Sequence, residues 1–212
     1  MKKLIDEIKD YAPSYGSLPF WSWNDKLDPD ELKRQIHNMH ELKMNGFFMH
    51  ARGGLETEYM SDEWFECIEA CVDEAKKLDM EAWSYDENGW PSGFAGGELL
   101  GDPANHALYL RFNESGTFPE DGDVLAVYVM EGESVRRVTQ PCGANKYLVI
   151  TRHADSSYVD TLDASITAKF IAATHERYLH RLGSDFGGGM PGFFTDEPQY
   201  YRWATPWSNI LP

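Results

Sequence analysis

Basic residues are scarce in this chain of 212 residues, which has 19 lysines and arginines against 35 aspartates and glutamates and a formal net charge of −16. Nucleic acids and anionic membrane surfaces are bound through basic patches that face phosphate groups. We therefore expect neither as a partner. A neutral substrate or a bound cation suits this charge better.

Cysteine and long apolar runs are also sparse. The three cysteines, Cys67, Cys71 and Cys142, provide neither a disulfide framework nor a zinc-ligand pattern. No stretch reaches the roughly 18 apolar residues of a membrane span. Residues 1–13 lack the apolar centre of a secretory signal. These absences predict a cytoplasmic protein without a membrane segment.

Two common catalytic signatures are missing as well. The sequence has no phosphate-binding loop of the Walker type and no Gly-x-Ser-x-Gly elbow. The glycine-rich stretch 93–97, GFAGG, does not follow a strand in the way that a phosphate loop requires. Phosphoryl transfer and serine-ester hydrolysis are therefore not indicated.

The chain does contain the material for a folded core, since 42% of it is hydrophobic and 14% is aromatic. Short apolar runs, which predict strands, alternate with helical periodicity over residues 28–46, 61–78 and 162–183. This alternation predicts an α/β fold with a parallel sheet. The predicted strands lie at residues 18–24, 46–50, 80–85 and 193–198.

The pattern changes between residues 106 and 152, where β-prone runs are separated by turn sequences. We interpret this part as an inserted, small antiparallel β-subdomain; the alternative is that these strands extend the main sheet. The predicted boundaries are 1–106 for the first part of the α/β unit, 107–158 for the insertion, and 159–212 for the continuation and tail.

Each predicted parallel strand ends in polar side chains. In parallel α/β folds the ligand site lies at the carboxyl ends of the strands. Any one of these groups could be an ordinary helix cap or a hydrogen-bonded structural residue. Together they predict a functional cleft built from Trp23, Asn24, His50, Arg52, Asp86, Glu87, Asp196 and Glu197.

The adjacent acids Asp196 and Glu197 cannot both enter one cleft while the chain stays extended, because successive strand side chains face opposite ways. Pro198 favours extended geometry at Glu197. We therefore expect Glu197 to be presented and Asp196 to support it. Several carboxylates around one cleft suit glycoside cleavage, or a hard metal ion with oxygen ligands.

Five blocks of the sequence resemble, in order, the amino-terminal part of the catalytic barrel of bacterial glycoside hydrolases related to the α-L-rhamnosidases of family 106. The blocks are PFWSWNDKLDPDELKRQI, GFFMHARGGLETEYMSDEW, YDENGWPSGFAGG, THERY and GFFTDEP. The resemblance implies a (β/α)8 TIM-type barrel that hydrolyses a terminal sugar, with a rhamnoside as one candidate. Some relatives bind calcium near the sugar, although no cofactor is required.

The resemblance also implies roles for individual residues. Glu197 is similar to a catalytic acid, and Asp86 and Glu87 are counted with it as catalytic candidates. Asp86 and Glu87, together with His50 and Arg52, also resemble sugar-contacting or site-shaping residues. Trp23 and Trp90 are candidate stacking platforms for a carbohydrate substrate.

The length departs from the family, because a complete barrel needs about 250 residues. We therefore expect a partial barrel of four strands whose second carboxylate could lie outside this chain. The chain could be a fragment of a longer enzyme and inactive alone, could self-associate through its open barrel edges, or could fold its tail over the open face.

Two other functions stay open: a non-catalytic carbohydrate-binding remnant, and a metal-dependent barrel of the isomerase or aldolase kind built on His50, Asp86, Glu87 and Glu197.

Overall fold

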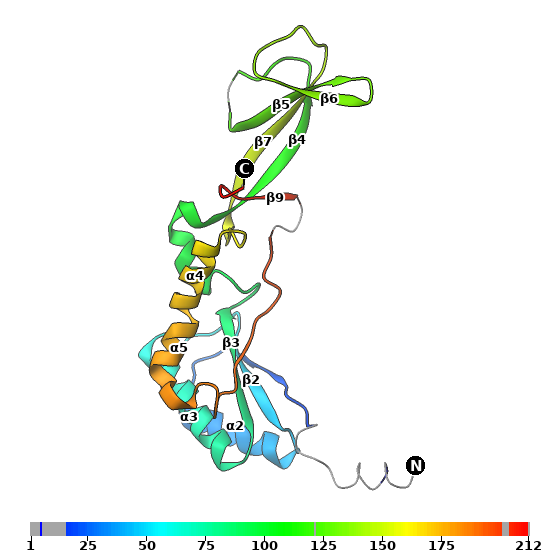
Figure 1. Cartoon of the computed structure of the whole chain (residues 1–212). Helices are drawn as coiled ribbons and strands as arrows, with labels where there is room; N and C mark the ends of the chain where they lie inside the picture. The colour runs from blue at the N-terminus through cyan, green and yellow to red at the C-terminus, as the bar shows by residue number, and fades with distance from the viewer. Residues whose placement is uncertain (1–4, 6–15, 121, 201–203, 212) are drawn as a thin grey trace. The chain divides into compact units, whose positions relative to one another are not determined.

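The computed structural model describes residue 5 and residues 16–120, 122–200 and 204–211. The chain forms two compact units (Figure 1). The first unit comprises residues 1–98 and 169–198, and the second comprises residues 99–168 and 199–212.

A parallel sheet forms the centre of the first unit. Its strands are β1 (Phe20–Trp23), β2 (Gly46–Ala51), β3 (Glu81–Asn88) and β8 (Phe193–Phe194), in the order β1-β2-β3-β8. Every neighbouring pair is parallel. The prediction of an α/β fold with four parallel strands is confirmed. Among the described residues these strands form an open sheet, so a closed barrel stays a prediction.

Two helices connect the first three strands. Helix α2 (Pro29–Glu41) starts after Asp28, whose carboxylate accepts the amides of Asp30 and Glu31. Helix α3 (Asp62–Lys77) starts after Ser61, whose hydroxyl accepts the amide of Trp64. Such caps satisfy amide groups that have no partner inside the helix.

The last helical segment differs from its prediction as one continuous helix. It forms α4 (Ala164–Ala173) and α5 (His175–Leu182), with a break at Thr174, where φ is −119° and ψ is −78°. The Thr174 hydroxyl donates to the carbonyl of Phe170 at 2.7 Å, and such a local bond competes with regular helix geometry.

Short 3-10 helices lie at Ala95–Gly101, Pro103–Asn105 and Gly183–Asp185. Within the described ranges, none of the helices has the length and apolar content to cross a membrane.

One face of the parallel sheet packs against the helices. The hydrophobic core there joins sheet residues to residues of α2, α3 and α5, among them Trp21, Trp23, Phe47, Met49, Ile36, Trp64, Ile68, Cys71, Tyr178 and Leu182. The opposite face carries an aromatic layer. Phe20 lies 5.3 Å from Phe48 and 4.8 Å from Phe194, between ring centroids.

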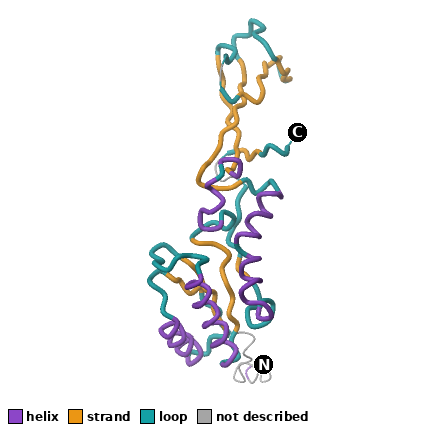
Figure 2. The backbone as a smooth tube through the Cα atoms, turned by 90° about the vertical axis from the view of Figure 1, so that its left-hand side faces the viewer, coloured by secondary structure: helices purple, strands orange, loops and turns teal. Residues whose placement is uncertain are grey.

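An antiparallel sheet forms the second unit, with the strand order β6-β5-β7-β4-β9. The strands are β4 (His106–Ser115), β5 (Val124–Glu131), β6 (Ser134–Val138), β7 (Tyr147–Val159) and β9 (Thr205–Trp207). The long strands β4 and β7 run side by side in both views (Figures 1 and 2). The predicted antiparallel strands are therefore present, and they form a sheet of their own instead of extending the parallel one. The described end of the tail adds β9 to this sheet.

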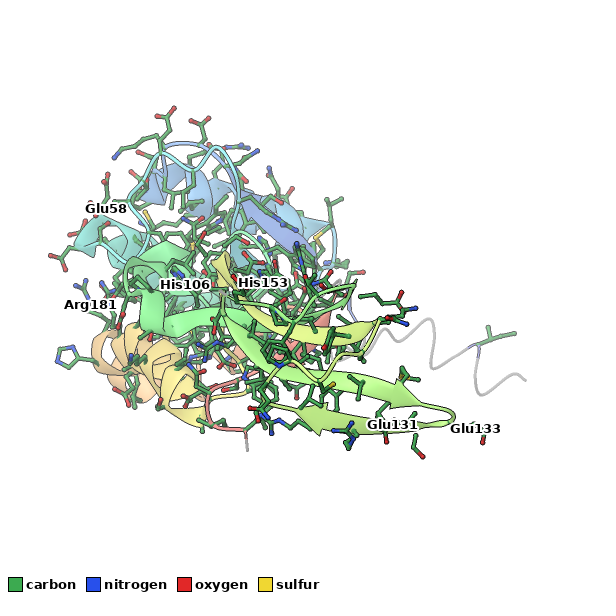
Figure 3. The ribbon with its side chains drawn as sticks, turned by 90° about the horizontal axis from the view of Figure 1, so that it is seen from above. Glu58, His106, Glu131, Glu133, His153 and Arg181 are labelled. Atoms are coloured by element: carbon green, nitrogen blue, oxygen red, sulfur yellow. The ribbon has the colours of Figure 1, made fainter. Side chains whose placement is uncertain are left out.

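The β5–β6 hairpin ends in two acidic residues, Glu131 and Glu133, which lie at its tip (Figure 3). Glu131 accepts a hydrogen bond from Nε of Arg136 at 2.8 Å. Valines from β5, β6 and β7 form a small core with Tyr147 behind the hairpin. Glu133 itself is exposed and serves below as a control position.

Candidate functional site

The carboxyl ends of the four parallel strands lie at one edge of the sheet, because every neighbouring pair is parallel. The predicted site residues follow or end these strands. Asn24 follows β1, His50 lies in β2, Asp86 and Glu87 lie in β3, and Asp196 follows β8. The contacts among these residues divide them into buried anchors and groups that reach the surface.

Asp86 is a buried anchor, with no exposed surface. Its Oδ1 accepts the Ser92 hydroxyl and its Oδ2 accepts the Thr195 hydroxyl, each at 2.6 Å. Nε2 of His175 lies 3.4 Å from Oδ2. A buried carboxylate is costly unless hydrogen bonds or an opposite charge compensate it, and three partners surround this one.

Ser92 ties the loop after β3 to the segment after β8. Its hydroxyl accepts the Asp196 amide at 2.9 Å, and its own amide donates to the Asp196 carbonyl, also at 2.9 Å. Sequence reasoning missed Ser92 because nothing in its spacing marks it. It missed a role for His175 too, although this residue stands in the THERY block.

Glu87 is the second buried anchor, again with no exposed surface. Its Oε2 accepts the amides of Gly93, Phe94 and Ala95 at 2.9–3.0 Å. Its Oε1 accepts the amides of Asn88 and Gly96. Burial raises the pKa of Glu87, and the backbone amides act against that shift. The glycine-rich stretch therefore wraps around a carboxylate of the chain itself.

Asp196 and Glu197 are the carboxylates that reach the surface. Asp196 is half-buried and its Oδ2 lies 3.3 Å from the Tyr85 hydroxyl, whereas Glu197 is exposed. The expected extended geometry at Glu197 is wrong, since its φ is +44°. β8 ends at Phe194, so strand alternation no longer governs these two residues.

His50 lies between aromatic rings and is only 1% exposed. It stacks on Tyr85 with ring centroids 3.7 Å apart and meets Phe20 edge-on at 5.2 Å. Neither ring nitrogen has a hydrogen-bond partner among the described residues. Burial, followed by the nearby Arg52 charge, lowers the pKa of His50 to about 4. The imidazole is therefore neutral at neutral pH.

The remaining predicted residues have different surroundings. Trp23 is 2% exposed and packs on Trp64 in the helix-side core. Asn24 and Arg52 are exposed, and Trp90 is half-buried. Of the two tryptophans named as stacking platforms, Trp90 is the one with accessible surface.

Two of the four residues named for a metal site, Asp86 and Glu87, are fully buried. Both oxygens of Asp86 and both of Glu87 already accept hydrogen bonds. Across the described ranges, His, Cys, Asp and Glu side chains form no group of three or more that could hold a metal ion.

No model of a protein family matches the sequence, and no curated protein matches it. Among solved structures the chain is similar to a rhamnosidase from Novosphingobium sp. PP1Y, with 24% sequence identity and a TM-score of 0.44. The match covers 54% of this chain and 11% of the rhamnosidase chain. A likeness of this size decides neither fold nor activity.

Proposed function

We propose that the carboxyl edge of the parallel sheet binds a terminal sugar and belongs to a glycoside-hydrolysing site. The observation that carries this proposal is the position of Asp196 and Glu197, two adjacent carboxyl groups that reach the surface shortly after β8, with Asp196 beside the Tyr85 hydroxyl. Carboxyl groups perform both steps of glycoside cleavage. One protonates the leaving oxygen, and the other either attacks the sugar carbon or activates a water molecule.

In this proposal Glu197 is the acid that protonates the leaving oxygen, and Asp196 is the second carboxylate of the pair. Asp86 and Glu87 have no exposed surface for a substrate to reach and act by holding the site together. The parallel sheet is proposed as the first half of a (β/α)8 barrel, on the sequence resemblance to family 106, and an aryl rhamnoside is the first substrate to test.

A second function, sugar binding without turnover, is favoured by one observation. Two of the three carboxylates named as catalytic, Asp86 and Glu87, are fully buried and occupied. A site that keeps its hydrogen-bonding groups but lacks a second carboxylate at the required distance would bind a sugar and leave it intact.

Hydrolysis of aryl glycosides by the wild-type chain, Glu197→Gln and Asp196→Asn tests the proposal, with Glu133→Gln as the matched control at the hairpin tip. We expect hydrolysis by the wild type and the control, and loss of at least about a hundredfold for Glu197→Gln. An unchanged rate in Glu197→Gln would refute the assignment. Calorimetric binding of free sugars without hydrolysis would support the second function.

A further inference from the structure

The buried Asp86 carboxylate is bonded to two segments that lie far apart in the sequence. Ser92 belongs to the loop that follows β3, and Thr195 belongs to the segment that follows β8. Each hydroxyl has a single proton to donate, and each hydroxyl oxygen lies 2.6 Å from an Asp86 oxygen, which accepts it. Bonds of this length to a carboxylate are strong and directional.

The direction of the Ser92 bond determines what its oxygen can do next. Because the proton goes to Asp86, the lone pairs of Oγ accept the amide of Asp196 at 2.9 Å. The Ser92 amide closes the ring by donating to the Asp196 carbonyl at 2.9 Å. The peptide groups of Asp196 are thus held on both sides, in a chain of hydrogen bonds that ends on the buried carboxyl group of Asp86 and in which each bond polarises the next.

Glu197, the residue after Asp196, has a backbone conformation that needs support from its surroundings. Glu197 has a φ of +44°, a conformation that non-glycine residues adopt only when the surrounding structure imposes it. We propose that Asp86 is the positioning residue of the Asp196–Glu197 pair and that it acts through the hydroxyl groups of Ser92 and Thr195. The inference rests on the proposed function only for its effect on catalysis; the geometric effect is measurable without any substrate.

Hydrogen exchange of the Asp196 amide, followed by NMR, tests the proposal directly. We expect about tenfold faster exchange in Ser92→Ala and Asp86→Asn, and a smaller increase in Thr195→Val, which is nearly isosteric but lacks the hydroxyl. Thr195→Ser keeps the hydroxyl and should exchange as the wild type does. Ser157→Ala removes an exposed hydroxyl that bonds Asp155 in the second unit, and it should leave the exchange rate of the Asp196 amide unchanged.

Loss of stability alone has a different signature from loss of positioning. If the Asp196 amide exchanges no faster than the measured change in unfolding free energy requires, or if Thr195→Val and Thr195→Ser exchange alike, the proposal is overturned. Thr195 is exposed, so these two variants decide the question even if Asp86→Asn fails to fold.

Enzyme kinetics then separates this inference from the proposed function. Where hydrolysis is observed, Thr195→Val should lower kcat with little change in KM, because the acid pair is displaced while sugar contacts persist. If Glu197→Gln hydrolyses normally while the Asp196 amide responds as expected, the proposed function fails and the positioning role stands. If the Asp196 amide exchanges in the variants as it does in the wild type, while Glu197→Gln loses activity, the positioning role fails and the proposed function stands.

Discussion

The imidazole of His50 stacks on the ring of Tyr85, with centroids 3.7 Å apart and an interplanar angle of 25°. The stack is buried, with His50 1% and Tyr85 0% exposed. Burial in this stack keeps the imidazole uncharged, which has a consequence for the stability of the first unit.

Because of His50, the free energy of unfolding should decrease as the pH is lowered from about 6.5 to about 4. An unfolded histidine takes up a proton near pH 6.5, whereas burial lowers the folded pKa to about 4. The unfolded state therefore binds more protons in this window, so the His50 contribution is complete above pH 6.5 and lost as the pH falls. Urea unfolding at several pH values measures it. His50→Phe keeps an aromatic ring there and should show a flatter pH dependence; equal slopes would contradict the prediction.

Glu87→Gln should destabilise the first unit by about 3 kcal/mol, because an amide nitrogen would face backbone N–H groups that now bond a carboxylate. Urea unfolding gives the free energy, and hydrogen exchange should show early loss of protection at residues 93–96. Glu133→Gln, at an exposed position, should stay within about 0.5 kcal/mol of the wild type. A similarly small change for Glu87→Gln would show that the loop does not depend on it.

Glu197→Gly should make the chain more stable while removing the acid. The φ of +44° at Glu197 costs a side chain about 1–2 kcal/mol, and glycine avoids this cost but gains freedom in the unfolded chain. We expect a net gain of about 0.5–1 kcal/mol in thermal or urea unfolding. Glu197→Gln keeps the Cβ and should leave stability unchanged. A loss of stability in Glu197→Gly would mean that the side chain itself holds this segment.

Gly46→Ala should be strongly destabilising, whereas Gly53→Ala should be neutral. A Cβ at Gly46 would lie 2.2 Å from the carbonyl oxygen of Glu81 on the neighbouring strand, but a Cβ at Gly53 would meet nothing within 4 Å. Overpacking against backbone forces strands apart, at a cost of about 3 kcal/mol. Equal unfolding midpoints for the two variants would contradict the close approach of β2 to β3.

Self-association is expected from the two outer strands of the parallel sheet. Among the described residues β1 pairs only with β2, and β8 pairs only with β3. Unpaired strand edges favour contact with other chains, while the net charge of −16 opposes it and is screened by salt. Light scattering should therefore give a mass that rises with protein concentration, and more steeply at high salt. A constant monomer mass under both conditions would refute this expectation.

Much of the local architecture could be predicted from the sequence because short-range chemistry dictates it. Asp28 and Pro29 marked the start of α2, and alternating apolar strands and amphipathic helices marked the parallel sheet. The helix break at Thr174 could not be predicted, since the apolar periodicity continues through it and the backbone angles and hydroxyl bond of Thr174 appear only in the structure.

The sequence placed the four acids at or just after β3 and β8, as the structure does, but it could not show which of them are buried. Asp86, Glu87, Asp196 and Glu197 are four acids that look equivalent in sequence. Asp86 accepts hydrogen bonds from Ser92 and Thr195, and Glu87 accepts them from the amides of residues 93–96. These donors come close to the acids only after the chain has folded.

The amino-acid order alone makes the chain acidic, gives it βαβ units and puts polar residues at or shortly after the strand ends. The burial of Asp86 and Glu87 and the exposure of Asp196 and Glu197 depend on the folded structure. They depend on it because the groups that cover and bond these acids come from distant segments, and the Asp86–Thr195 bond joins residues 109 positions apart.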